Sequence, residues 1–197
     1  MVAHLYHQAR FLTSAAELDQ LPPDEGIEVA FAGRSNAGKS TVLNVLTGQR
    51  QLARTSKTPG RTQLINLFEL DETRRLVDLP GYGFAKVPQA VKHRWQVTLS
   101  RYLESRTCLG GLVLLMDIRH PMQPVDRTML DWAIASKLHT HILLNKSDKL
   151  SRSAVAMTVQ QVKKELEAYS FISVQAFSGL KRTGMDELVG QLNLWFA

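Results

Sequence analysis

The chain has 197 residues, of which 44% are hydrophobic and 21% charged, and its formal net charge at pH 7 is +6. This length suits one globular domain that can bury a sufficient core without disulfides or a structural metal. The single cysteine, Cys108, excludes an intrachain disulfide, and we interpret it as a small core side chain. No stretch reaches the ~18 apolar residues of a membrane span, and residues 1–11 lack a signal-peptide pattern, so we expect a cytoplasmic protein without a membrane partner.

Strand and helix patterns alternate along the chain. Strands are predicted at residues 28–33, 62–70, 74–79, 112–118, 141–145 and 171–177, with a hairpin joining the second and third. Helices are predicted at residues 39–46, 90–103, 124–138, 151–169 (with a serine cap) and 185–196. The sum is an α/β fold with a mostly parallel, six-stranded sheet and helices on both faces. Because such sheets bind ligands at the carboxyl ends of their strands, functional residues are expected in the loops that follow strands.

The first such loop reads GRSNAGKS and fits the phosphate-loop pattern G-x-x-x-x-G-K-[ST]. Its glycines let the backbone N–H groups point at phosphate oxygens, and the following helix N-terminus adds a favourable field. Lys39 is predicted to bridge the β- and γ-phosphates, and the Ser40 hydroxyl to bind Mg²⁺. The predicted nucleotide contacts here are Gly33, Arg34, Ser35, Asn36, Ala37, Gly38, Lys39, Ser40 and Thr41.

A second loop, Asp78-Leu79-Pro80-Gly81, fits D-x-x-G directly after a predicted strand. The Asp78 carboxylate can hold Mg²⁺ through water, and the Gly81 N–H can reach the γ-phosphate. A threonine between the first helix and the second strand should complete the Mg²⁺ ligands; Thr55, Thr58 and Thr62 are candidates, and we favour Thr62 because it begins the strand. The loop residues Gly60, Arg61, Thr62, Gln63 and Leu64 are predicted to line the nucleotide.

A third loop, Asn145-Lys146-Ser147-Asp148, follows another predicted strand. The Asp148 carboxylate can accept hydrogen bonds from the N1–H and 2-amino group of guanine, and adenine offers neither donor. Lys146 can lie over the base, and Asn145 can tie this loop to the phosphate loop. After the last strand, Phe177-Ser178-Gly179-Leu180 fills the place of an S-A-[KL] loop whose backbone N–H meets guanine O6, with glycine in place of alanine.

These motifs, with Thr58-Pro-Gly-Arg-Thr62-Gln63 and Asp78-Leu-Pro-Gly-Tyr-Gly83, resemble the EngB (YihA/YsxC) family of bacterial GTP-binding proteins, in the Era-like group. The resemblance covers nearly the whole chain. It implies a three-layer, Ras-like P-loop GTPase fold, with residues 26–197 as the G domain and residues 1–25 as an extension packed on it. It also implies Mg²⁺ ligation by Ser40 and Thr62, and a role in assembly of the large ribosomal subunit that affects cell division and septation. Asn145, Gly179 and Arg182 depart slightly from the family pattern.

The catalytic group is the least defined part of the site. Ras-like enzymes orient the attacking water with a glutamine directly after D-x-x-G, and here that position is Tyr82. We therefore expect slow hydrolysis, aided by a partner or by a monovalent cation. Asn36 resembles the K⁺-binding asparagine of related K⁺-activated GTPases, although it can also simply cap the loop. The residues assigned to catalysis are Lys39, Asn36, Thr62 and Gly81.

Basic residues are concentrated between residues 50 and 106. This stretch contains eleven Lys and Arg residues and five acidic ones, and the difference of six equals the net charge of the chain. Both predicted switch loops, residues 49–61 and 81–88, lie in this region. This favours nucleotide-gated binding of ribosomal RNA by a monomer, and a solvated charged face is the alternative. Two further hypotheses remain open: a nucleoside or nucleotide phosphotransferase, and an RNA-binding module with a vestigial nucleotide site.

Overall fold

A computed structural model of the chain describes residues 3–53, 64–83 and 89–197. Its strands are β1 (Arg10–Ala15), β2 (Ile27–Gly33), β3 (Ile65–Glu69), β4 (Arg74–Asp78), β5 (Leu109–Asp117), β6 (Thr140–Asn145) and β7 (Ile172–Ala176). Its helices are α1 (Ala3–His7), α2 (Lys39–Leu46), α3 (Gln89–Ser105), α4 (Pro124–Ala135), α5 (Arg152–Glu165) and α6 (Met185–Trp195). Two short 3₁₀ turns are η1 (Leu18–Gln20) and η2 (Ser147–Lys149).

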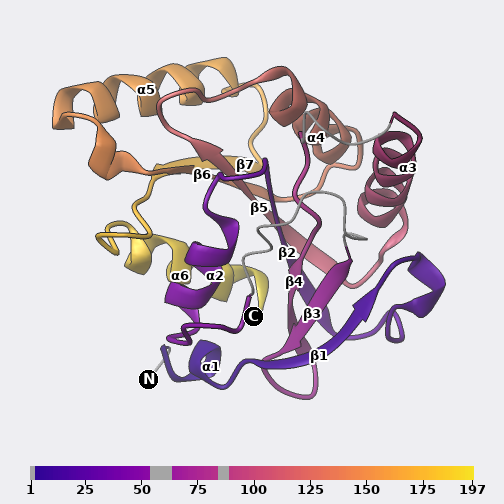
Figure 1. The fold of residues 1–197 in the computed structure, drawn as a ribbon. Coiled ribbons are helices and arrows are strands. Elements are labelled where there is room, and N and C mark those ends of the chain that lie inside the picture. The colour runs from indigo at the N-terminus through magenta and orange to yellow at the C-terminus, as the bar shows by residue number, and fades with distance from the viewer. Residues whose placement is uncertain (1–2, 54–63, 84–88) are drawn as a thin grey trace.

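The strands form one sheet in the order β1-β3-β4-β2-β5-β6-β7 (Figure 1). Strands β4, β2, β5, β6 and β7 are parallel, whereas β3 is antiparallel to both β4 and β1. The β3–β4 hairpin confirms the hairpin predicted around the polar turn. In the centre of the sheet, β2 pairs with β4 on one side and β5 on the other, so the loop after β2 leaves the sheet between two parallel neighbours.

The predicted α/β architecture is confirmed, but the sheet has seven strands rather than six. The additional strand, β1, pairs with the outer edge of β3. Its sequence RFLTSA carries Phe11 and Leu12 in succession, and both side chains are exposed. A strand whose apolar residues do not alternate between a buried and an exposed face lacks the period of two that identifies strands in a sequence.

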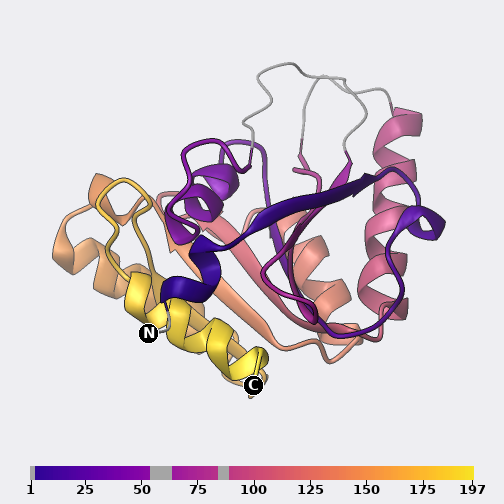
Figure 2. The same ribbon diagram turned by 90° about the horizontal axis from the view of Figure 1, so that it is seen from below.

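Helices cover the sheet on both faces, each over its own apolar core (Figures 1 and 2). Leu99, Leu130 and Val162 bring α3, α4 and α5 onto one face. Tyr6 and Leu43 belong to the core of the other face, which α1, α2 and α6 cover. Because β5 is covered on both faces, its residues from Gly111 to Asp117 are buried without alternation, as the continuous apolar run in the sequence predicts.

The N-terminal segment packs on the last helix. The Tyr6 hydroxyl donates to Asn193 Oδ1 at 2.7 Å, and its ring centroid lies 6.5 Å from that of Phe196. Figure 2 shows α1 beside α6 accordingly. The segment from β1 to β2 also clamps the start of β5, because the Asp24 carboxylate accepts from the backbone N–H groups of Thr107 and Cys108.

Cys108 is buried at this clamp, as predicted for a small core side chain. Burial raises the pKa of its thiol to about 12, so the thiol stays protonated at neutral pH. It is therefore a packing residue rather than a nucleophile.

A buried cluster of charged side chains anchors the C-terminal end of α3. Glu28 of β2 is fully buried and accepts hydrogen bonds from Arg75, Tyr102 and Arg106. Burial opposes ionisation of this carboxylate, but the hydrogen bonds from Arg106 and Tyr102 outweigh it and hold the pKa of Glu28 below its usual value. Because a buried carboxylate is stable only when its oxygens are paired, the cluster fixes the C-terminal end of α3 to the sheet.

Most element ends agree with the sequence predictions to within three residues, and the serine cap of α5 is confirmed by the bond from Ala154 N to Ser151 Oγ at 3.3 Å. The fifth helix ends earlier than predicted, at Glu165 rather than Tyr169. Among the described residues, none of the helices combines the length and the apolar character that crossing a bilayer requires.

Candidate nucleotide-binding site

Four of the predicted loops meet at the carboxyl edge of the sheet. They follow β2 (residues 34–38), β4 (residues 79–83), β6 (residues 146–150) and β7 (residues 177–184). Direct hydrogen bonds and an ion pair join them. Parallel strands that end at one edge bring side chains distant in sequence into one place, which is why this edge carries the site.

The phosphate loop has the backbone that its glycines predict. Gly38 has a φ of +96° and caps the N-terminus of α2. A Cβ at this position would lie 2.3 Å from Asn145 Nδ2, so only glycine fits between the two loops. Asn36 has a φ of +66°, in the left-handed region that asparagine tolerates better than most residues. Both conformations turn the backbone sharply between β2 and α2.

Lys39 and Asp78 form an ion pair across this turn. Both side chains are mostly buried, and the pair places the first turn of α2 against the end of β4. Ser40 follows Lys39 in that turn, so a hydroxyl and a carboxylate lie at the same end of the sheet. Such hard oxygen donors suit Mg²⁺, which takes few protein ligands and keeps water and phosphate oxygens for the rest. The donor set present therefore fits this ion.

The D-x-x-G loop lies directly on the phosphate loop. Tyr82 O accepts from Ser35 N at 2.9 Å, and Tyr82 N donates to Gly33 O at 3.4 Å. Gly81, the residue expected to meet the γ-phosphate, directly precedes Tyr82 and is therefore held close to the phosphate loop. The two loops are therefore in backbone contact through Tyr82.

The Tyr82 side chain points to α4. Its hydroxyl donates to Asp126 Oδ1 at 3.1 Å, and Asp126 Oδ2 lies 3.3 Å from Arg34 Nε of the phosphate loop. Burial and the neighbouring Asp126 raise the pKa of the Tyr82 hydroxyl well above its usual value, and burial raises the pKa of Asp126. Tyr82 is thus engaged as a packing and hydrogen-bonding residue, in keeping with the expectation that it is a poor substitute for a water-orienting glutamine.

Asn145 joins three loops with one amide. Its Nδ2 donates to Ala37 O at 2.8 Å, which is the tie to the phosphate loop expected from the sequence. Its Oδ1 accepts from Gly179 N at 3.2 Å. A Cβ on Gly179 would lie 3.1 Å from Thr41 Cγ2, so an alanine at this position would need a small shift of the Thr41 methyl group.

Asp148 is held by the loop after β7. Ser178 Oγ donates to Asp148 Oδ1 at 2.6 Å, and this hydrogen bond lowers the pKa of the carboxyl. Asp148 is thus ionised at neutral pH, and its carboxylate oxygens can accept further hydrogen bonds. The Ser178 hydroxyl in turn accepts from Lys181 N at 3.1 Å, so the loop folds back around this contact.

Lys146 crosses to the phosphate loop. Its Nζ donates to Asn36 O at 2.7 Å and lies 3.0 Å from Asp117 Oδ2. Hydrogen bonds from Arg119 and Lys146 hold the pKa of Asp117 well below its usual range. The ammonium group of Lys146 is thus fixed by these contacts. The aliphatic part of the side chain spans the distance between the loop after β6 and the phosphate loop.

The remaining predicted residues are placed as follows. Leu64 precedes β3 at the site edge, because Asn66 of β3 pairs with Asp78. Leu79 and Pro80 are buried behind the loop, Phe177 is buried, Ser147 is half-buried, and Leu180 is 71% exposed. Thr55, Thr58, Gly60, Arg61, Thr62 and Gln63 lie outside the described residues, as does most of both predicted switch loops.

Two carboxylates of this edge were not predicted. Asp117 ends β5, and the rule that placed Asp78 and Asn145 at strand ends applies equally to it, so the signal was available. Asp126 lies inside α4 at its capping box, and nothing in the local sequence distinguishes it from an ordinary first-turn acid. Only the fold brings it to Arg34 and Tyr82.

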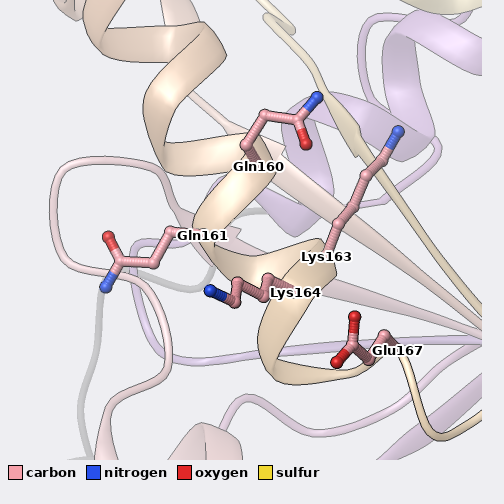
Figure 3. Close-up of a pocket in the computed structure, with 5 residues that line it drawn as sticks. All are labelled: Gln160, Gln161, Lys163, Lys164 and Glu167. Atoms are coloured by element: carbon pink, nitrogen blue, oxygen red, sulfur yellow. The ribbon is translucent and has the colours of Figure 1, made fainter.

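Among the hollows that the described residues line are two outside the loops of the site. One of about 800 Å³ runs from Phe11 and Phe68 along residues 49–53 to Asp78, beside the phosphate site. The other, of about 530 Å³, is lined by Gln160, Gln161, Lys163, Lys164 and Glu167. Figure 3 shows that these side chains spread from one helix, α5, and the turn after it, so they form an open surface rather than a built site.

Comparison with known proteins agrees with this geometry. Residues 28–146 match the family described as "50S ribosome-binding GTPase". The chain is 56% identical over 193 residues to the probable GTP-binding protein EngB of Pasteurella multocida, covering 98% of this chain and 94% of that protein. It is 55% identical over 196 residues to the protein of the same name from Coxiella burnetii (strain CbuK_Q154), covering 99% and 96%.

A solved structure extends the agreement to the fold. The crystal structure of a probable GTP-binding protein engB superposes with a TM-score of 0.70 at 23% identity, covering 86% of this chain and 98% of that one. A phosphate loop, a D-x-x-G loop and an N-K-S-D loop joined at one sheet edge accompany this likeness. The chain therefore belongs to the EngB family of GTP-binding proteins, and it is a GTPase.

Proposed function

We propose that this GTPase is a Mg²⁺-dependent nucleotide switch that acts in assembly of the large ribosomal subunit. The observation that carries the switch is the contact of Tyr82 with Ser35 and Gly33, because it holds Gly81 against the phosphate loop. A γ-phosphate that binds at this junction adds a contact to Gly81, so its loss removes that contact while the backbone contact of Tyr82 remains. The family description, "50S ribosome-binding GTPase", supports the large subunit as the partner.

Within this proposal each loop has a role. The phosphate loop holds the β- and γ-phosphates through its backbone and Lys39. Ser40, Asp78 and Thr62 hold Mg²⁺, which when bound neutralises developing charge on the phosphates. Asp148 reads N1–H and the 2-amino group of guanine, Gly179 offers its N–H to O6, and Lys146 covers the base. Residues 26–197 form the G domain, with residues 1–25 as the extension on it.

The partner is the large ribosomal subunit or its RNA. The excess of basic residues between 50 and 106 includes the segments around the site, and RNA phosphates are the anions that such a surface attracts. The protein then acts as a cytoplasmic monomer, where the ribosome is built. The need for it in cell division and septation follows from the family resemblance.

This proposal is tested by co-sedimentation with ribosomal subunits. With a non-hydrolysable GTP analogue, the protein should pellet with the large subunit, and with GDP it should remain mostly in the supernatant. Because the contacts are to phosphates, raising the salt from 50 to 200 mM should weaken the association about tenfold or more. Equal association under both nucleotides would contradict the switch, and association that salt leaves unchanged would contradict the RNA surface.

We further propose that K⁺ supplies the charge that a catalytic side chain would otherwise supply. Hydrolysis should be slow in NaCl and about tenfold or more faster in KCl at equal ionic strength, because a cation held by the Asn36 side chain beside the phosphates would neutralise charge that develops there. Turnover of GTP by Asn36→Ala should lose the difference between the two salts. The same rate in both salts for the wild type would remove this role of Asn36, leaving it as a loop cap.

The alternatives explain less of the site. A nucleoside or nucleotide phosphotransferase needs the phosphate loop but gives no reason for the bonds that tie Asn145 and Lys146 to it. A vestigial nucleotide site in an RNA-binding module gives no reason for the buried Lys39–Asp78 pair or for the hydrogen bond that holds Asp148.

A further inference from the structure

A chain of polar side chains, half-buried at Ser173 and buried at His141 and Gln175, runs beneath the loop that follows β7. Ser173 Oγ lies 2.6 Å from His141 Nδ1, and His141 Nε2 lies 2.7 Å from Gln175 Oε1. Gln175 Nε2 then donates to Gly184 O at 2.9 Å and to Ala176 O at 3.2 Å. His141 and Gln175 are each 2% exposed. Nothing in the phosphate or guanine motifs accounts for these residues.

The direction of every hydrogen bond in the chain is determined. Because Gln175 Nε2 donates to two carbonyl groups, its Oε1 must face His141 and can only accept. His141 therefore carries its proton on Nε2, and its Nδ1 accepts from the Ser173 hydroxyl. Burial lowers the pKa of His141, so the neutral ring that this arrangement needs is the form present at neutral pH.

This chain of hydrogen bonds ends at Gly184, where the loop after β7 meets the start of α6. Ser178 N donates to Thr183 O at 3.1 Å, which closes residues 178–183 into a small loop next to Gly184. Gly184 has a φ of +83°, and a Cβ on it would lie 2.6 Å from Gln175 Nε2 and 2.7 Å from Ala176 O. The strand end, Gln175 and the start of α6 are thus packed against one another without spare room.

From Gly184, the loop of residues 178–183 reaches the carboxylate of Asp148, to which recognition of guanine is assigned. Ser178 donates to Asp148, and Gly179 donates to Asn145. A shift of Gly184 would move Ser178 through Thr183 and would turn the Asp148 carboxylate away from its position. The link from Gln175 to Asp148 therefore consists of three hydrogen bonds, to Gly184, between Ser178 and Thr183, and to Asp148, joined by the chain itself.

We propose that Gln175, oriented by His141 and Ser173, is a positioning residue for guanine selectivity. It acts through Gly184 and Ser178 and touches no ligand. The proposal rests on the guanine contacts assigned to Asp148 and Gly179 above. A contribution of Gln175 to the stability of β7 alone is the competing interpretation, and the two differ in what they predict for related bases.

Gln175→Met tests the proposal, because methionine keeps the volume of the side chain and removes its donor and acceptor. The matched control is Val174→Ala, which weakens the same strand from the opposite face, where Val174 packs in the core under α3, α4 and α5. For each protein the affinities for GDP and IDP are measured. IDP lacks the 2-amino group, so the ratio of the two affinities reports how well Asp148 is placed, and both values come from the same folded protein.

The preference for GDP over IDP should fall about tenfold in Gln175→Met, because a misplaced Asp148 loses one charge-assisted hydrogen bond. In Val174→Ala the ratio should stay at the wild-type value even if the melting temperature falls. Ser173→Ala, a milder change at the outer end of the chain, should reduce the ratio in the same direction by a smaller factor. Faster amide hydrogen exchange over residues 177–184 should accompany the loss in Gln175→Met.

An unchanged ratio in Gln175→Met or in Ser173→Ala, or an equal loss in Val174→Ala, would overturn the proposal. Asp148→Asn, which should exchange guanine for xanthine, separates this result from a failure of the guanine assignment. If that variant exchanges guanine for xanthine while Gln175→Met leaves the ratio intact, the guanine assignment stands and only the role of Gln175 is lost. If it does not, the guanine assignment itself fails.

Discussion

Replacing Asp148 with asparagine should exchange the base preference of the protein from guanine to xanthine. The carboxylate accepts from both N1–H and the 2-amino group, whereas an amide offers one acceptor and one donor. The donor would face the 2-amino group of guanine but would pair with the 2-carbonyl oxygen of xanthine. Because Ser178 already donates to Oδ1, the amide oxygen can keep that partner and the amide nitrogen can take the other position.

The affinity of Asp148→Asn for GDP should fall about 100-fold, because the bond to the 2-amino group is replaced by two opposed donors and the bond from N1–H loses its charged acceptor, together about 3 kcal/mol. Affinity for XDP should rise above that for GDP, as measured by displacement of a fluorescent nucleotide. Asp131→Asn is the control, because Asp131 is an exposed carboxylate on α4 that changes identically in charge. A variant that still prefers GDP would show that another group selects the base.

Removing the ammonium group of Lys39 should abolish useful nucleotide binding. In Lys39→Ala the phosphates lose their buried positive partner, and affinity for GTP should fall about 100-fold or more, corresponding to about 3 kcal/mol. One of the exposed lysines on α5 provides a control, since Lys163→Ala removes the same charge from a surface position and should leave affinity unchanged. Isothermal titration with GTP and Mg²⁺ measures both.

Lys39→Ala also leaves the buried Asp78 carboxylate without its partner, so the nucleotide-free protein should melt at a lower temperature. The double variant with Asp78→Asn separates the two effects. It should recover much of the melting temperature, because no unpaired charge remains, but none of the nucleotide affinity. Recovery of both would mean that Lys39 serves folding rather than phosphate binding.

Much of the fold and the positions of the site loops could be predicted from the sequence. The phosphate loop, Asp78 and Asn145 each follow an apolar run, and parallel strands must bring such ends to one edge. Strand β1 could not be predicted, because Phe11 and Leu12 are exposed and its pairing depends on β3, more than fifty residues away. Local periodicity carries no record of such a partner.

The side-chain contacts of the site were predicted only where a motif specifies them. Asn145 was expected to reach the phosphate loop, and it does. The engagement of Tyr82 by Asp126 and of Asp148 by the Ser178 hydroxyl requires the three-dimensional arrangement of separate elements. The proposed roles of Thr62 and its neighbours remain predictions, because those residues lie outside the described parts of the chain.

The amide of Asn145 has a thermodynamic consequence for ligand binding. One side chain is bonded to the loop that holds phosphates and to the loop that meets the base, so ordering either loop lowers the entropic cost of ordering the other. The two halves of a nucleotide then bind cooperatively, and their joint free energy exceeds the sum of the separate ones. By linkage, binding of the correct purine raises the affinity for the diphosphate by the same factor as binding of the diphosphate raises the affinity for the purine.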